Sequence, residues 1–183
     1  MTLSVYVIGS QVLKKKAEDI DKSFEGLDQL IADMFETMYK SDGVGLAAPQ
    51  IGKSIRLFVV DSTPFSENDE SLKDFKKAFI NAKITEFSGE KIYYNEGCLS
   101  VPGIREEVQR YEKIRIEYYD ENFEFHDEEF SGIKAWIIQH EYDHIEGVLF
   151  VERLSSIRKK LIKSKLKTIE GGKFEASYKA KIA

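Results

Sequence analysis

Apolar residues recur every three or four positions in two stretches of the chain, which is the spacing of a helix with one buried face. The first stretch predicts a helix that begins near Leu27 and ends near Asp42 and Gly43. The second predicts a C-terminal helix from about Ser155 to Glu170. We expect the first helix to pack in the core through Leu27, Leu30, Ile31, Met34, Phe35 and Met38.

Between these two helices the pattern changes to the alternation and the short apolar runs of β-strands. Ile55–Val60 indicates a buried strand, and strand character follows at Ala78–Phe87 and Ile92–Asn95. Apolar and polar residues then alternate along Val108–Tyr118, and a polar turn leads into Phe123–His126. We expect the last two segments to form a hairpin with His126 on an exposed face.

A third helix is expected between Ser131, whose hydroxyl can cap its first turn, and Gly147, which should stop it. One side of this helix carries Ile133, Trp136, Ile137, His140 and His144. Strands in the middle of the chain, helices at both ends and one central helix indicate an α+β fold. We expect mixed or antiparallel β-sheets around the central helix.

The composition fits one globular domain over residues 1–183. The chain is 42% hydrophobic and 32% charged, and no apolar run approaches the roughly 18 residues of a membrane span. Its first residues lack the basic and apolar regions of a signal peptide, so we expect a cytoplasmic protein without a membrane partner. The single cysteine cannot form an internal disulfide.

The net charge of -5 hides a basic C-terminal part. Residues 158–183 contain nine Lys or Arg and two Glu, so the remainder of the chain is strongly acidic. A solvated helix face is the simpler explanation for this basic helix and tail, which begin at about residue 155. Transient docking to an anionic surface such as ribosomal RNA is the functional alternative.

The sequence His140-Glu141-Tyr142-Asp143-His144 carries the strongest chemical signal. On a helix, His140 and His144 lie one turn apart on one face, where both imidazoles can bind the same metal ion, and Glu141 projects from nearby. A catalytic ion needs at least one further protein ligand and keeps one position open for water. The third ligand therefore has to come from elsewhere in the chain.

Two glycine-containing segments can bring further groups to this ion. Cys98 is the best third ligand, because a turn at Gly97 can present its thiol between two strand-like segments. His126 lies on a charged strand, and Glu146 follows the motif too closely to fold back. The segment Gly43–Gly52 has three Gly and one Pro, which predict irregular backbone that can line a site.

A zinc endopeptidase and a closed structural metal site in a peptide-binding module are alternatives at this point. However, the segments 45–50 (GLAAPQ), 96–100 (EGCLS) and 139–144 (QHEYDH) together resemble the three motifs of the peptide deformylase family, in the same order. The resemblance implies removal of the N-formyl group from formyl-methionyl nascent peptides. It also implies one divalent metal ion, usually native Fe²⁺, with Zn²⁺, Ni²⁺ or Co²⁺ able to take its place.

The resemblance implies a role for each matching residue. Cys98, His140 and His144 correspond to the metal ligands, and Glu141 corresponds to the group that takes a proton from water and returns it to the departing amine. The side-chain amide of Gln50 and the backbone N–H of Leu99 correspond to the donors that stabilise the oxyanion.

The same resemblance places Val44 beside the methionine side chain and Gly45 against an extended substrate backbone. Arg105 resembles a position that contacts the substrate, although an ordinary surface arginine is the alternative. Helix geometry alone puts Trp136 and Ile137 on the metal-facing side, where they can wall an apolar pocket or pack in the core. Asp143 is a candidate to support the ligands, and Arg110 is its candidate partner.

Overall fold

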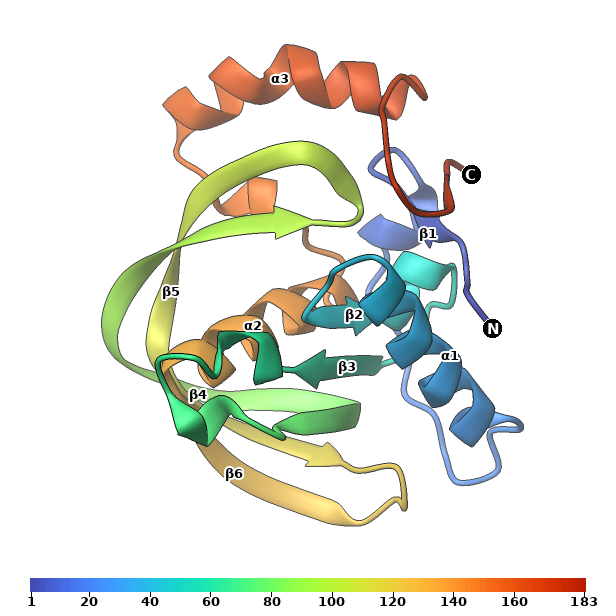
Figure 1. Cartoon of the computed structure of the whole chain (residues 1–183), viewed down its shortest axis with the longest axis vertical. Coiled ribbons are helices and arrows are strands. Elements are labelled where there is room, and N and C mark those ends of the chain that lie inside the picture. The colour runs from blue at the N-terminus through green and yellow to red at the C-terminus, as the bar shows by residue number, and fades with distance from the viewer.

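The computed structural model describes residues 1–183 and contains three α-helices (Figure 1). They are α1 (Leu27–Lys40), α2 (Gly132–Ile145) and α3 (Ser156–Glu170). None of them is both long and apolar enough to cross a membrane. The helices predicted from the apolar stripes at residues 27–38 and 155–170 are confirmed.

The main sheet has five antiparallel strands in the order β2-β3-β4-β5-β6. Most of it is one long hairpin, in which β4 and β5 are joined by a turn at Leu99 and Ser100. A second, two-stranded sheet pairs β1 (Val5–Tyr6) in parallel with β7 (Ala180–Lys181). The strands of the main sheet are β2 (Gly45–Ala47), β3 (Leu57–Asp61), β4 (Lys76–Cys98), β5 (Val101–Tyr119) and β6 (Phe125–Ser131).

Strand β3 separates two apolar cores, and every one of its residues is buried. Phe58 and Val60 belong to the core that α2 covers, while Leu57 and Val59 belong to the core that α1 covers. Because successive side chains of a strand point to opposite faces, a strand with a helix on each face is apolar throughout. This explains the apolar run at residues 57–60, within the segment 55–60 that predicted a buried strand.

A third apolar cluster joins the end of the β4–β5 hairpin to the chain termini. Val101, Ile104 and Val108 of β5 pack there with Val7 and with the inward face of α3. Ile162 and Ile169 are the buried residues of α3, Leu166 is half-buried against the same cluster, and the rest of the helix is exposed. The α+β fold therefore consists of two sheets and three helices, with α2 contacting β2, β3, β5 and β6.

Several local predictions need correction. The turn near the thiol lies at Leu99 and Ser100, because Gly97 is still within β4 and pairs with Arg105. Ser131 occupies the N-cap position of α2, but its hydroxyl makes no capping hydrogen bond, since its backbone still pairs with Lys113 as the last residue of β6. The two strand segments at 78–87 and 92–95 are parts of one strand, β4.

Candidate metal centre

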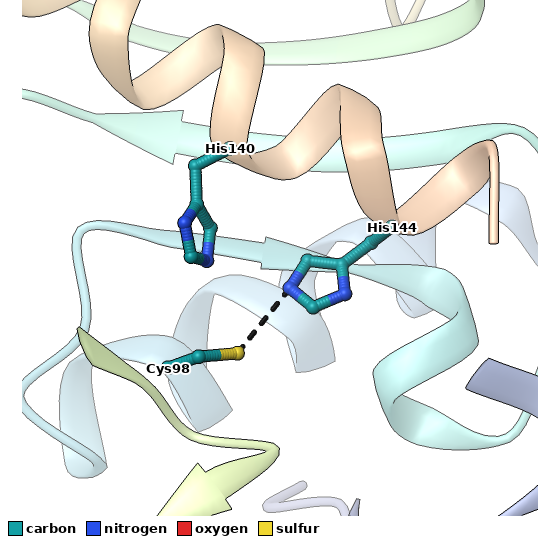
Figure 2. A group of neighbouring side chains, drawn as sticks. All are labelled: Cys98, His140 and His144. Atoms are coloured by element: carbon teal, nitrogen blue, oxygen red, sulfur yellow. Dashed lines mark hydrogen bonds between the residues drawn. The ribbon is translucent and has the colours of Figure 1, made fainter. Parts of the chain in front are cut away.

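Three potential metal ligands meet between the hairpin end and α2 (Figure 2). Cys98 is the last residue of β4, and His140 and His144 project from successive turns of α2. Each residue offers one ligand atom, and these three atoms lie within 4.8 Å of one another. The Cys98 Sγ lies 3.3 Å from His144 Nε2. The structure thus brings together the ligand set expected from sequence.

Glu96 orients the ring of His140. Its carboxylate accepts a hydrogen bond from His140 Nδ1 at 2.6 Å, so Nε2 is the nitrogen left to bind an ion. Burial lowers the pKa of His140, but hydrogen bonds with Cys98 and Glu96 outweigh it and raise the pKa well above its ordinary value, so an ion bound at Nε2 would displace a proton. Trp136 Nε1 donates to the same carboxylate at 3.1 Å. Burial raises the pKa of Glu96, but hydrogen bonds from Arg110 and His140 outweigh it and lower the value to about 2. Glu96 is therefore ionised.

A chain of buried charges continues from Glu96 to the surface. Arg110 donates to both carboxylate oxygens of Glu96 at 2.8 Å and to Asp143 Oδ2 at 2.6 Å. Asp143 in turn accepts two hydrogen bonds of 2.5 Å from Arg153. The predicted pairing of Asp143 with Arg110 is confirmed. Because α2 carries both Asp143 and the two histidines, these contacts hold the helix against the hairpin.

Glu141 is a buried carboxylate that forms no ion pair with Arg110 or Arg153. The residue is 4% exposed, and its Oε2 has no hydrogen-bond partner. Burial raises the pKa of Glu141 to about 7. Gly45 lies directly against it, since a Cβ atom at position 45 would come within 2.7 Å of the Glu141 Cδ. A glycine is thus required there for the carboxylate to keep its place.

Gln50 faces the same centre from the short 3₁₀ helix Ala48–Ile51. Its Oε1 accepts a hydrogen bond from the Ala47 N–H at 2.9 Å, which directs its amide nitrogen toward the hairpin turn. That nitrogen lies 3.2 Å from Ser100 Oγ and 3.5 Å from Cys98 Sγ. The predicted irregular segment 43–52 therefore contains β2 and one 3₁₀ turn, and it does line the site.

The donor set fits one divalent transition metal ion. A thiolate and two neutral imidazoles are ligands that such ions prefer. Burial lowers the pKa of His144 far below its ordinary value, so its ring is neutral and can offer a lone pair. A separation of 3.3 Å between Cys98 Sγ and His144 Nε2 also suits two ligands at tetrahedral angles, which lie about 3.5 Å apart.

Comparison with known proteins decides the family. The model of the family described as polypeptide deformylase matches residues 2–160. The chain belongs to the peptide deformylase family. A peptide deformylase of Christiangramia forsetii is 51% identical over 98% of this chain and 95% of that protein, and one of Flavobacterium psychrophilum is 50% identical over 100% of this chain and 97% of that protein.

Solved structures agree with this assignment. Peptide deformylase 1B of Arabidopsis thaliana, in complex with an inhibitor, superposes with a TM-score of 0.83 at 35% identity, covering 93% of this chain and 91% of that chain. The peptide deformylase of Thermus thermophilus gives 0.83 at 38% identity, covering 94% and 99%. Members of the family are metallohydrolases that remove the N-formyl group from nascent polypeptides, so the endopeptidase and binding-module alternatives are wrong.

A cavity of about 530 Å³ opens beside the ligands of this deformylase-family chain. The expected substrate-binding residues Val44, Gly45, Arg105, Trp136 and Ile137 all line it. The Trp136 ring stacks on Tyr94 with centroids 4.6 Å apart. Arg105 is held by Asn95, whose Oδ1 accepts from its Nε at 2.7 Å.

Sequence reasoning missed several parts of this cavity wall, among them Phe65, residues 101–104 and residues 175–178. Phe65 comes from a polar loop that offered no periodic pattern, and it packs on Trp136. Residues 175–178 come from the segment after α3, for which no structure was predicted. The contacts of Glu96 were also missed, although a carboxylate two residues before a candidate ligand cysteine was a usable signal.

The two rejected ligand candidates are engaged elsewhere. His126 hydrogen-bonds Asp120 at 2.7 Å and stacks on Tyr118, so it is half-buried and less exposed than expected. Glu146 forms an ion pair of 2.7 Å with Arg56. Both residues lie outside the group formed by the cysteine and the two histidines.

Proposed function

We propose that the chain hydrolyses formyl-methionyl peptides at this cavity, with Cys98, His140 and His144 holding one divalent metal ion on helix α2 and the hairpin end. The observation that carries the proposal is the meeting of three ligand atoms within 4.8 Å beside Glu141, a buried carboxylate with one unpartnered oxygen. Such a carboxylate is available for proton transfer.

We propose Fe²⁺ as the native ion, with Zn²⁺, Ni²⁺ or Co²⁺ able to replace it. When bound, a divalent ion acts as a Lewis acid and acidifies water. Imidazole and thiolate suit all four ions, so the ligand types do not select among them. Metal analysis after anaerobic purification tests the assignment. Activity that survives prolonged aeration would contradict native iron.

Glu141 moves the proton in the proposed reaction. Its carboxylate accepts a proton from the water that attacks the formyl carbon. It then delivers this proton to the amine nitrogen as the C–N bond breaks, which yields formate and a free N-terminus. A pKa of about 7, raised by burial, allows one group to serve as base and then as acid.

Gln50 and Leu99 stabilise the charge that develops on the formyl oxygen. The Gln50 amide nitrogen already lies 3.5 Å from Cys98 Sγ, and the Leu99 N–H follows Cys98 in the chain. Donors fixed in advance at such a position need no rearrangement during the reaction, and loss of one typically costs about 100-fold or more in turnover.

The peptide substrate adds a strand to β2. This strand lies at the edge of the main sheet, and its Gly45 lines the cavity. An exposed edge can bind an extended peptide through backbone hydrogen bonds. Val44, Trp136 and Ile137 then offer an apolar wall to the methionine side chain, and Arg105 contacts the substrate backbone.

Formate release from formyl-Met-Ala-Ser tests the function. Wild type should release formate and leave an unformylated, N-blocked peptide intact. Glu141→Gln should lose at least about 100-fold in kcat, the usual contribution of an acid–base group, while keeping its metal content. Undiminished kcat in this variant would refute the mechanism, and internal cleavage of the blocked peptide without formate release would refute the function.

We further propose that residues 1–183 act as one deformylase domain in the cytoplasm, and that α3 contacts the ribosome transiently. Lys159, Lys163 and Lys167 are exposed on α3. Replacing all three by Glu should abolish salt-sensitive co-sedimentation with ribosomes and leave tripeptide turnover unchanged. Equal co-sedimentation of variant and wild type would contradict the proposed docking to the ribosome.

A further inference from the structure

The segment that follows α3 folds back onto the active-site cavity. Its strand β7 pairs in parallel with β1, so that Val5 lies opposite Ala180 and Tyr6 opposite Lys181. Figure 1 shows this red segment descending beside the blue β1. Just before β7, Glu175, Ala176, Ser177 and Tyr178 line the cavity together with Cys98 and Glu141. The segment is therefore a wall of the site.

Tyr178 makes a specific contact with the hairpin turn. Its hydroxyl donates a hydrogen bond of 2.6 Å to the carbonyl oxygen of Leu99. The next carbonyl of the turn, that of Ser100, accepts a hydrogen bond of 2.7 Å from the N–H of Ile8. Ile8 closely follows β1 and Tyr178 closely precedes β7, so the small β1–β7 sheet holds both carbonyls of the turn.

Two functional groups lie next to each other where β4 enters this turn. Cys98 supplies the thiolate, and the N–H of Leu99 is a proposed oxyanion donor. A tilt of the Leu99 carbonyl changes the backbone torsions of Leu99, which move the peptide planes on both sides of it. A misplacement of reacting groups by about 1 Å can cost about 100-fold in rate.

We propose that Tyr178 is a positioning residue for the deformylation reaction, because it fixes the turn that presents the Leu99 N–H beside the proposed metal ligand Cys98. The inference rests on the proposed role of Leu99 in oxyanion binding. Tyr178 acts through the Leu99 carbonyl and is not itself assigned a proton transfer. The ring also forms part of the cavity wall, so its hydroxyl and its ring are expected to have separable effects.

Tyr178→Phe removes the hydroxyl and keeps the ring. We expect its kcat for formyl-Met-Ala-Ser to fall about tenfold, which is less than the roughly 100-fold cost of deleting an oxyanion donor. Its KM should stay within about twofold, because one lost hydrogen bond to the turn leaves the peptide-binding edge unchanged. Tyr178→Ala should show the same loss in kcat and, in addition, a raised KM.

Tyr93→Phe is the matched control, since Tyr93 lies on β4, is 63% exposed and does not line the cavity. Its kcat and KM should equal those of wild type. An unchanged kcat in Tyr178→Phe would overturn the inference and leave the proposed function standing. Absence of formate release by wild type would instead overturn the proposed function.

Cobalt substitution provides a measurement that does not depend on turnover. Tyr178→Phe loaded with Co²⁺ should bind the same amount of metal as wild type and retain the ultraviolet absorption of a thiolate bound to cobalt. Its thermal unfolding midpoint should lie within about 5 °C of that of Tyr93→Phe, since one hydrogen bond is lost. A loss of metal or of this band in parallel with kcat would overturn positioning, because the turn would then have lost its ligand.

Discussion

At the scale of single residues, Glu96 shows how a buried carboxylate can support a candidate metal ligand. It accepts hydrogen bonds from His140, Arg110 and Trp136, and its side chain is 1% exposed. A ligand histidine whose second nitrogen is held in this way keeps both its tautomer and its ring orientation. The order of the candidate metal centre therefore depends on a residue that lies outside the proposed ligand set.

Glu96→Gln should weaken metal binding about 10- to 100-fold, the usual cost of losing such a supporting group. The amide cannot accept all the hydrogen bonds that the carboxylate accepts, so the His140 ring is less firmly held. Competition with a chromophoric chelator measures the dissociation constant. Glu107→Gln is the control, because Glu107 is exposed on β5 directly opposite Asn95. Equal metal affinity in both variants would disprove the role of Glu96.

The sequence located the candidate ligands, which the structure brings together, better than the residues around them. His140, Glu141 and His144 follow from helix geometry alone, because their spacing within one helix is fixed. The contacts of Glu96 come from β5 and α2, and Tyr178 reaches Leu99 from 79 positions away. Local spacing carries no information on such pairs, since they depend on how distant elements pack.

At the scale of elements, Arg110 links the β4–β5 hairpin to α2. Its side chain is 3% exposed, and it bridges Glu96 of β4 and Asp143 of α2. Removing one partner of a buried ion pair leaves the remaining charge without compensation. In contrast, Arg115 on the same strand pairs with Asp127 at the surface, where its side chain is 51% exposed.

Arg110→Met should lower the free energy of unfolding by about 3 to 5 kcal/mol, because Glu96 and Asp143 both lose their shared partner. Arg115→Met provides the matched control and should change the free energy by less than about 1 kcal/mol, the usual range for a solvent-exposed pair. Urea denaturation of both metal-loaded variants gives the comparison. Equal losses of unfolding free energy in the two variants would show that burial of the ion pair does not determine its contribution to stability.

The helices and strands were predictable where a regular apolar spacing extends over many residues. Helices α1 and α3 and strand β5 each present a repeated apolar spacing. Strand β4 was predicted as two segments because its middle, residues 88–91, is polar and mostly exposed to solvent. Strands β2, β1 and β7 have two or three residues each, which is too short for any periodicity.

At the scale of the whole molecule, the proposed ion joins the hairpin end to α2. A ligand that binds only the folded state stabilises it by mass action. Free metal at 100 times its dissociation constant contributes about 2.7 kcal/mol, which corresponds to about 5 to 10 °C in Tm for a chain of this size. Removal of the metal by a chelator should therefore lower Tm by about that amount.

Calorimetry with and without chelator measures this shift, and Cys98→Ser is the control. Without the thiolate the ion binds weakly, so the chelator should change the Tm of this variant by less than about 2 °C. An equal shift in wild type and variant would mean that the chelator acts at another place.

The pairing of β1 with β7 also sets the order in which a newly made copy becomes complete. Val5 leaves the ribosome early, but its partner Ala180 is synthesised after all of the main sheet and all three helices. A nascent copy thus possesses Cys98, Glu141 and both histidines before Tyr178 can reach Leu99. The contact of Tyr178 with Leu99, which we propose to position the site, therefore forms only after the candidate ligands and Glu141 have been synthesised.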